Sequence, residues 1–276
     1  MEEAMAEDVI KVTYAGRIAT ITIDNSRKLN ALNMEQYYAL SKAMREVAAR
    51  DDIYITVLTG KGRYFSAGAN VSLMNGKEPT DPDVYREWLR GFVANNLNLT
   101  QAFYTHPKVL VAALNGPAVG LSAALTAFAD FVYATPHTFL LTPFSSLGLV
   151  TEGGASRALV QRLGVARANE ALIMSRRIPC EELVAAGYVN KVFDAGNPED
   201  SDAFLRLVMR EVDERLGDHL IGDSLVGIKA LIRRPEIEVL ERQNVAEVFA
   251  GLDRFVKGVP QEEFNKIATG RKRHNL

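Results

Sequence analysis

A single carboxylate stands at the start of an apolar, helix-forming segment. Residues 146–164 read SLGLVTEGGASRALVQRLG, with Glu152 ahead of two glycines and apolar Leu147 and Leu149 just upstream. A carboxylate in apolar surroundings can serve as a base, because burial raises its pKa and keeps water away. The alternative is an exposed acid in the first turn of a helix, where the helix dipole favours negative charge.

Two further stretches contain small residues and backbone groups suited to a ligand. In YFSAGANV, residues 64–71, small side chains let a ligand approach the backbone closely, although a flexible turn would have the same composition. In LNGPAVGLSAAL, residues 114–125, Gly120 and Leu121 fall in the first turn of an apolar helix. Free N–H groups at a helix start favour an anion. Tight helix packing is the alternative for this stretch.

The elements that must position these residues alternate between strands and helices. Apolar periodicity predicts a hairpin at 9–24 around Ala15-Gly16 and a helix over 34–52. It also predicts buried strands at 53–60 and 108–114, a helix over 84–106, a small-residue helix over 120–129, and short strands at 131–136 and 138–143. A short helix and a strand follow within 178–193, and amphipathic helices at 203–217, 224–234 and 236–256 complete the chain. This predicts an α/β core over residues 1–198 and a helical region over 199–276.

Composition limits the classes of function. The 276 residues carry a net charge of -2, with 47% hydrophobic and 24% charged residues, as in an ordinary globular protein. Neither a nucleic acid nor an acidic membrane is an expected partner at this charge. We also expect no membrane span, because Asn115-Gly116-Pro117 interrupts the longest apolar stretch. The acidic N-terminus does not resemble a secretory leader.

Metal and disulfide chemistry are not expected either. Cys180 is the only cysteine, so no intrachain disulfide and no thiolate metal cage can form. The histidines, at positions 106, 137, 219 and 274, are scattered and show no metal-binding spacing. We therefore predict a protein without a metal site.

Taken together, the three stretches resemble the crotonase (enoyl-CoA hydratase/isomerase) superfamily, and the resemblance runs from RIATITIDNSRKLNALN at 17–33 to the C-terminal helices. It implies a spiral of ββα repeats with a C-terminal helical region that builds trimers or hexamers. It also implies an acyl-CoA thioester as the ligand and no separate cofactor. The expected oxyanion hole consists of the backbone N–H groups of Ala69 and Leu121. Ala67, Gly68, Ala69, Asn70, Val71 and Leu121 are expected to bind substrate.

The resemblance separates isomerases from hydratases through their acids. The two glutamates of the family's hydratases fall at Ala124 and Phe144 here, so nothing would hold or activate a water molecule for hydration. Glu152, in SLGLVTEGG, matches the segment that marks the Δ3,Δ2-enoyl-CoA isomerases, particularly fungal peroxisomal ones. The implied reaction moves a proton from C2 of a 3-enoyl-CoA to C4. One carboxylate can serve both carbons of the allylic system.

Two more positions follow from the resemblance. Asn96 matches a helix asparagine near the catalytic acid, and a surface asparagine is the alternative. Lys28 falls where the family places a residue beside the CoA nucleotide, and it could equally be a solvated lysine. The family often has Asp where Asn70 stands here, which puts the hydrogen bonding of that loop in doubt.

Three other hypotheses compete with this one. A dienoyl-CoA isomerase is expected to need a second acid, and none stands at the matched positions; a thioester hydrolase would use the same CoA site. A non-catalytic acyl-CoA-binding module is the third. The C-terminal tripeptide His-Asn-Leu is a divergent match to a peroxisomal signal, so we expect a peroxisomal protein, otherwise a cytoplasmic or mitochondrial-matrix one.

Overall fold

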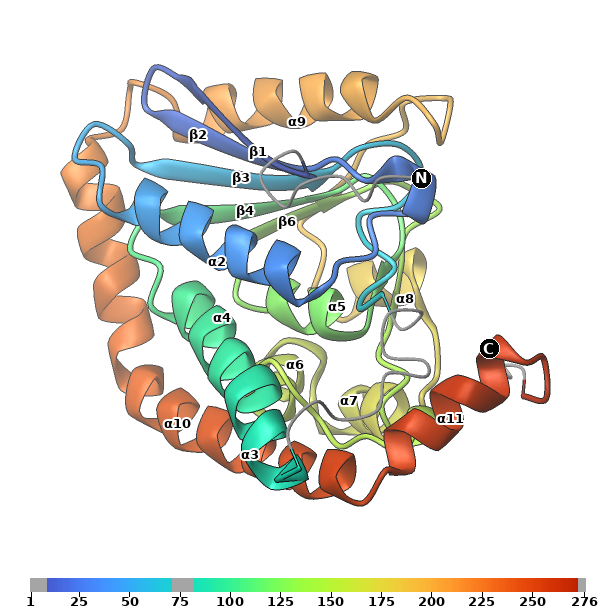
Figure 1. Ribbon diagram of the computed structural model, residues 1–276. Helices are drawn as coiled ribbons and strands as arrows, with labels where there is room; N and C mark the ends of the chain where they lie inside the picture. Colours follow the sequence, from blue (N-terminus) through green and yellow to red (C-terminus); the bar gives the residue numbers. More distant parts are fainter. Residues whose placement is uncertain (1–8, 71–81, 273–276) are drawn as a thin grey trace.

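The strands form one large and one small sheet. The structure is a computed structural model that describes residues 9–70 and 82–272, and within them six strands lie in the order β1-β2-β3-β4-β6-β9 (Figure 1). These strands are β1 (Ile10–Ala15), β2 (Ile18–Ile23), β3 (Ile55–Gly60), β4 (Val109–Leu114), β6 (Phe131–Ala134) and β9 (Lys191–Val192). The predicted hairpin is confirmed, because β1 pairs antiparallel with β2 around Gly16. The other neighbouring strands of the sheet run parallel.

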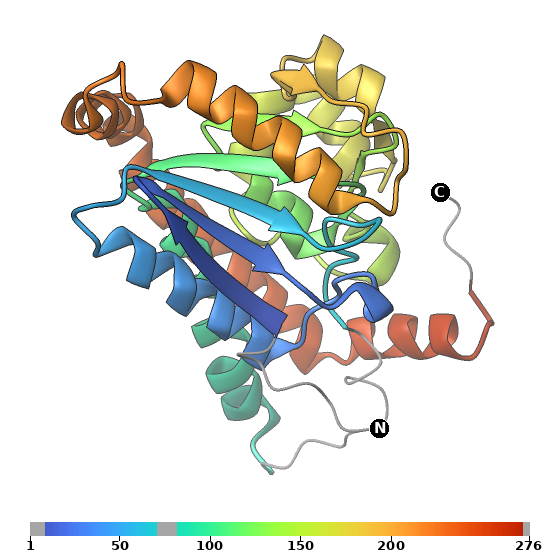
Figure 2. The same cartoon turned by 90° about the horizontal axis from the view of Figure 1, so that it is seen from above.

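Helices cover both faces of the large sheet. Figures 1 and 2 show α9 (Ser201–Leu216) on one face and α2, α4 and α5 on the other. The helices before residue 199 are α2 (Met34–Ala48), α3 (Val84–Trp88), α4 (Ala94–Tyr104), α5 (Gly120–Thr126), α6 (Ala155–Leu163), α7 (Val165–Leu172) and α8 (Cys180–Ala185). Short 3-10 turns lie at η1 (Ser26–Lys28) and η4 (Ser145–Leu147).

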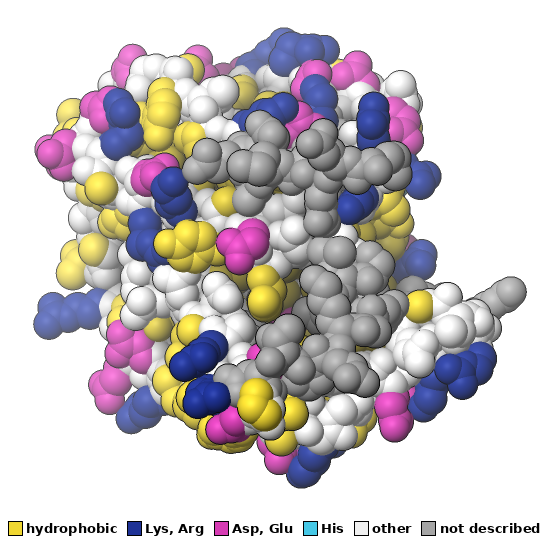
Figure 3. All heavy atoms as spheres, viewed as in Figure 1, with side chains coloured by type: hydrophobic (Ala, Val, Ile, Leu, Met, Phe, Trp, Pro, Cys, Tyr) yellow, Lys and Arg dark blue, Asp and Glu magenta, His cyan; other side chains and the backbone are white. Residues whose placement is uncertain are grey.

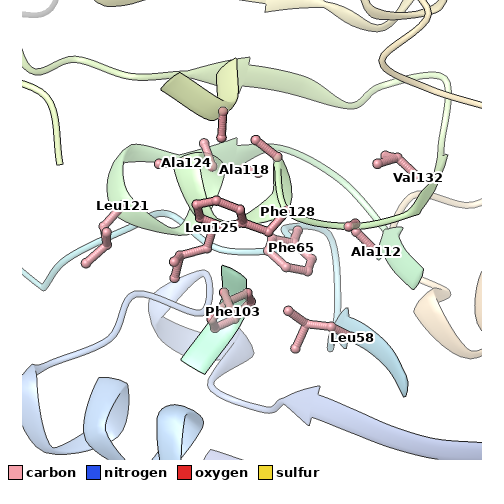
Figure 4. Packing of buried hydrophobic residues seen from close by; sticks show 14 of the residues in the cluster. Leu58, Phe65, Phe103, Ala112, Ala118, Leu121, Ala124, Leu125, Phe128 and Val132 are labelled. Atoms are coloured by element: carbon pink, nitrogen blue, oxygen red, sulfur yellow. The ribbon is translucent and has the colours of Figure 1, made fainter. Parts of the chain in front are cut away.

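Side chains of the buried strands alternate between two hydrophobic clusters. Along β4, Val109 and Val111 belong to the cluster with α9, whereas Leu110 and Ala112 belong to the cluster on the opposite face. Figure 4 shows part of this second cluster, where Phe65, Phe103 and Leu125 are packed between the sheet and α5. Both faces of the parallel strands are covered, which explains why their sequences read as continuous apolar runs.

A small sheet lies beside α5. Its strands are β5 (Ala118–Val119), β7 (Phe139–Leu141) and β8 (Ile178–Pro179), in that order. β5 pairs parallel with β7, and β7 pairs antiparallel with β8. Because β5 ends directly before the first residue of α5, this sheet fixes where that helix begins.

The segment 84–106, predicted as one long helix, contains a π turn. Helix α3 passes into the π turn η3 (Leu89–Val93) and then into α4. The wider turn rotates α4 relative to α3, and such turns are frequent at functional sites. Asn96 lies in the first turn of α4, directly after this change.

The C-terminal helices are α9 (Ser201–Leu216), α10 (Gly222–Val256) and α11 (Val259–Ala268). The two predicted helices at 224–234 and 236–256 are one helix, α10, which continues through Pro235. Proline removes one backbone donor, but a long helix packed along much of its length can absorb that loss. The expected division of the chain at residue 198 stays a prediction. Among the described residues, no helix is long and apolar enough to cross a membrane.

Candidate active site

The turn that carries Glu152 is pressed against α5. Gly153 has φ +69°, and a Cβ atom there would lie 2.7 Å from Leu121 Cδ1 and 3.1 Å from Ala124 Cβ. Only a residue without a side chain allows this approach. The Glu-Gly-Gly sequence therefore places Glu152 beside the first turn of α5. Leu121, the predicted backbone donor, lies in that turn.

Asn96 contacts the carboxylate directly. Its Nδ2 donates to Glu152 Oε2 at 2.8 Å, and the Asn96 side chain is buried. Thr100 Oγ1 donates to Asn96 Oδ1 at 3.3 Å, which sets the orientation of the amide. The structure thus brings Asn96 and Glu152 together from sequence positions that are 56 residues apart.

Burial controls the titration of Glu152. Although Glu152 as a residue is only partly buried, its carboxyl lies deep enough that burial raises the pKa to about 7. The hydrogen bond from Asn96 opposes this rise, and the negative charge of Glu247 adds to it. A carboxyl with a pKa near neutrality can both take up and release a proton, as a general acid–base group must.

The two small-residue stretches lie side by side. Ser66 bridges to Ala118, and Val119 N donates to Ser66 O at 2.9 Å. A Cβ at Gly68, which has φ +85°, would lie 2.8 Å from Val119 O. The glycine thus lets the SAGA loop (Ser66–Ala69) close onto the start of α5.

Two backbone amides, where residues 66–69 meet the start of α5, have no acceptor in the part of the chain that the structure describes. Within residues 9–70 and 82–272, neither the Ala69 N–H nor the Leu121 N–H has a hydrogen-bond partner, while the neighbouring Asn70 N–H donates to Leu32 O at 2.8 Å. Leu121 lies in the first helical turn, where amides have no partner within the helix. These are the groups expected to form the oxyanion hole.

A buried network of hydroxyl groups links the SAGA loop to the start of α5. Tyr37 Oη lies 3.0 Å from Ser122 Oγ, and Ser66 Oγ lies 2.9 Å from Ser122 Oγ. Ser66 Oγ also accepts from Gly68 N at 3.1 Å. Burial raises the pKa of Tyr37, so the phenol stays neutral. This network connects α2, α5 and the SAGA loop, and the sequence analysis did not identify it.

Of the remaining predicted ligand-binding residues, Ala67 lies in the same loop and Lys28 precedes a segment that contacts it. Ala67 N donates to Leu29 O at 2.9 Å, which joins the SAGA loop to the segment that follows the exposed Lys28. Val71, most of the loop at 74–83 and the His-Asn-Leu tail lie outside the described residues.

Charges of both signs are interspersed on the face shown in Figure 3. Its described side chains do not gather into a continuous basic surface of the kind that binds nucleic acid. Across residues 9–70 and 82–272, no group of three or more His, Cys, Asp or Glu side chains could hold a metal ion.

A second buried acid lies close to Glu152 and was missed by the sequence analysis. Glu247, on α10, is 4% exposed and accepts from Gly154 N at 2.7 Å and from Ser156 N at 2.8 Å. In the sequence it stands among the charged residues of an amphipathic helix, so no local pattern marks it. Only the packing of α10 against the start of α6 reveals its position.

Comparison with known proteins finds a matching family and related enzymes. The profile of the family described as enoyl-CoA hydratase/isomerase matches residues 13–207. A protein from Pyricularia oryzae named Delta(3,5)-Delta(2,4)-dienoyl-CoA isomerase is 64% identical, covering 97% of this chain and 99% of its own length. The 3,2-trans-enoyl-CoA isomerase of Saccharomyces cerevisiae is 32% identical, with 100% and 99% covered.

Solved structures agree with the fold. The crystal structure of an enoyl-CoA hydratase/isomerase from Pseudoalteromonas atlantica T6c superposes with a TM-score of 0.81 at 25% identity, covering 97% of this chain and all of that one. The predicted crotonase-like α/β fold with a C-terminal helical region is thereby confirmed. The chain belongs to the enoyl-CoA hydratase/isomerase family, the crotonase superfamily.

Proposed function

We propose that the protein is an enoyl-CoA isomerase in which Glu152 alone carries the proton. The observation that supports this most strongly is the position of the Glu152 carboxyl. It has a pKa near 7, it accepts from Asn96, and it lies on the turn packed against Leu121. The named relatives from Pyricularia oryzae and Saccharomyces cerevisiae are both isomerases of CoA thioesters, which agrees with the proposal.

The reaction that fits this arrangement is a 1,3-proton shift. Ionised Glu152 removes a proton from C2 of a 3-enoyl-CoA, and the electron pair of the C–H bond forms a dienolate with its charge on the thioester oxygen. The N–H groups of Ala69 and Leu121 donate to that oxygen. Protonated Glu152 then returns the proton to C4, so the double bond moves from C3–C4 to C2–C3. Oxyanion donors of this kind contribute about 2.7–4 kcal/mol each in other enzymes.

Hydration is disfavoured by the residues around Glu152. Ala124 and Phe144, at the positions of the hydratase glutamates, are both buried and apolar. Adding water across a double bond needs a group that holds and activates the water molecule. Neither side chain can do so, and Asn96 is committed to Glu152 and Thr100.

The second candidate is a 3,5-dienoyl to 2,4-dienoyl shift, which the 64% identical relative favours by its name. That reaction returns the proton at C6, two bonds beyond C4. A single carboxylate reaches C4 more readily than C6. Glu247 is an unsuitable second proton carrier, because both of its oxygens accept from donors at the start of α6.

Turnover of matched substrates separates the two candidates. Purified protein should be assayed with 3-trans-hexenoyl-CoA and with a 3,5-dienoyl-CoA of the same length, with products identified by chromatography. The proposal expects a kcat/KM that is higher for the monoene. A preference for the diene would replace it with the second candidate, and turnover of neither would favour a hydrolase or a non-catalytic acyl-CoA-binding protein.

The proposed assembly and ligand follow the family. We propose that acyl-CoA is the only small-molecule partner, with no separate cofactor and with Lys28 beside its nucleotide.

A homotrimer or hexamer is proposed, and the exposed apolar residues Ile228, Leu231 and Ile232 on α10 are consistent with association. A peroxisomal location is proposed because a Mus musculus relative, 31% identical over 96% of this chain, is named enoyl-CoA delta isomerase 3, peroxisomal. Fluorescent fusions with and without the His-Asn-Leu tripeptide would test this location.

A further inference from the structure

Glu247 caps the N-terminal end of α6. Its Oε2 accepts from Gly154 N at 2.7 Å, and its Oε1 accepts from both the backbone N and the hydroxyl of Ser156. Helix starts leave such N–H groups without partners, and the positive end of the helix dipole favours a carboxylate there. The acid thus comes from a helix about 90 residues away in sequence, replacing the local side chain that usually caps a helix.

The contact belongs to a line of polar side chains along one side of α10. Gln243 Nε2 donates to Ser156 Oγ at 2.7 Å, and Glu236 forms a paired ion contact with Arg157. Residues 236, 243 and 247 are separated by seven and four positions, which places them on one helix face. This face of α10 therefore holds the start of α6, directly after the turn that carries Glu152.

We propose that Glu247 is a positioning residue for Glu152: its two carboxylate oxygens hold the Glu152–Gly154 turn through the backbone N–H groups of Gly154 and Ser156 at the start of α6. This inference rests on the proposed role of Glu152 as the base. A neutral capping side chain would satisfy the same N–H groups. A second buried carboxylate adds an electrostatic effect that a neutral cap lacks.

Charges on the surrounding elements agree with this assignment. The negative charge of Glu247 raises the pKa of Glu152, after the larger effect of burial. Burial also raises the pKa of Glu247, while the donors around it oppose the rise. Tyr37 from α2 is a neutral phenol, and Arg157 from α6 is paired with Glu236.

The test uses Glu247→Gln and Glu247→Asp, with Glu236→Gln as the matched control. Glu236 lies on the same helix and contacts the same partner helix, but it neighbours Arg157 rather than the catalytic turn. The first readout is the pKa of Glu152, measured by NMR of isotopically labelled glutamate carboxyls and assigned with Glu152→Gln. The second readout is the pH profile of kcat/KM for 3-trans-hexenoyl-CoA.

Removing the charge should lower the pKa of Glu152, so Glu247→Gln moves the acidic limb of the profile to lower pH. Glu247→Asp keeps the charge but is too short to reach both amides, so the limb stays near its wild-type position while kcat falls by up to about 100-fold. Glu236→Gln should change neither readout. A Glu152 pKa that is unchanged in Glu247→Gln, or equally changed in Glu236→Gln, overturns the inference.

The outcomes also separate this inference from the proposed function. A shifted Glu152 pKa in a protein that turns over no enoyl-CoA would support the electrostatic link and refute the isomerase role. If neither Glu247 variant folds, Ser156→Ala removes one donor to Glu247 and leaves both acids in place. A lower kcat with unchanged KM then supports positioning, and a wild-type kcat overturns it.

Discussion

Replacing Asn96 by alanine should produce a loss of activity that disappears at alkaline pH. Asn96 Nδ2 donates to Glu152 Oε2 at 2.8 Å, and this bond favours the ionised carboxylate. Hydrogen bonds to charged groups contribute about 1.5–3 kcal/mol, and about 1.4 kcal/mol corresponds to one pKa unit. The pKa of Glu152, about 7 in the native protein, should therefore rise by about one to two units in Asn96→Ala.

The rate effect follows from the ionised fraction. At pH 7 about half of the Glu152 carboxyls are ionised in the native protein, and about a tenth to a hundredth would be ionised in the variant. Because the base must be ionised to accept a proton, kcat/KM at pH 7 should fall about five- to fifty-fold. At a pH well above the new pKa, both proteins should approach the same rate.

The measurement is kcat/KM for 3-trans-hexenoyl-CoA across the pH range, for wild type, Asn96→Ala and Asn98→Ala. Asn98 lies on the same helix, but it donates to Ser41 Oγ instead of the carboxylate, so its profile should not move. An acidic limb that moves to lower pH in Asn96→Ala, or a loss equal at every pH, would refute the reasoning.

Three further predictions concern stability and the oxyanion hole. Burial raises the pKa of Glu152 from 4.5 to about 7, so the free energy of unfolding of the wild type falls as pH rises through this interval. Glu152→Gln should therefore be more stable than the wild type by up to about 3 kcal/mol at pH 8, but not at pH 4. Urea unfolding of both proteins at the two pH values measures the difference. Gly68→Ala should lower kcat about 10²–10³-fold by displacing a backbone donor. Gly16→Ala, also at positive φ but with open space around it, should keep wild-type kcat. Ser122→Ala should lower the free energy of unfolding by about 1–3 kcal/mol, because it leaves the buried Tyr37 hydroxyl without this partner. The double variant with Tyr37→Phe should recover part of that stability, as measured by chemical denaturation.

The three candidate site segments were predictable because each is local. In SAGA, NGPAVGLS and TEGG, glycines mark where backbones must approach closely, and the contacts of Gly68 and Gly153 confirm that approach. Asn96 was identified through the family resemblance, and the structure places it on the carboxylate.

Contacts between distant segments could not be read from the sequence. Glu247 belongs to a charged, amphipathic pattern typical of a solvated helix face, and only the packing of α10 against α6 buries it. The π turn before Asn96 contains Gly91, but an isolated glycine in a helical pattern is tolerated and does not by itself predict a π turn. Pro235 suggested a break, but α10 continues through it. Arg233 and Glu236, on either side of the proline, form ion pairs with Asp130 and Arg157, and such tertiary contacts can override local preference.

The most direct test of the central claim is conversion of 3-trans-hexenoyl-CoA to 2-trans-hexenoyl-CoA by wild type and Glu152→Gln side by side. Glutamine keeps the shape of the side chain and can still accept from Asn96, but it cannot carry the proton. The account predicts that the wild type forms the 2-trans product and that Glu152→Gln forms it only at the uncatalysed rate. Equal conversion by both proteins would contradict the assignment of Glu152 as the base.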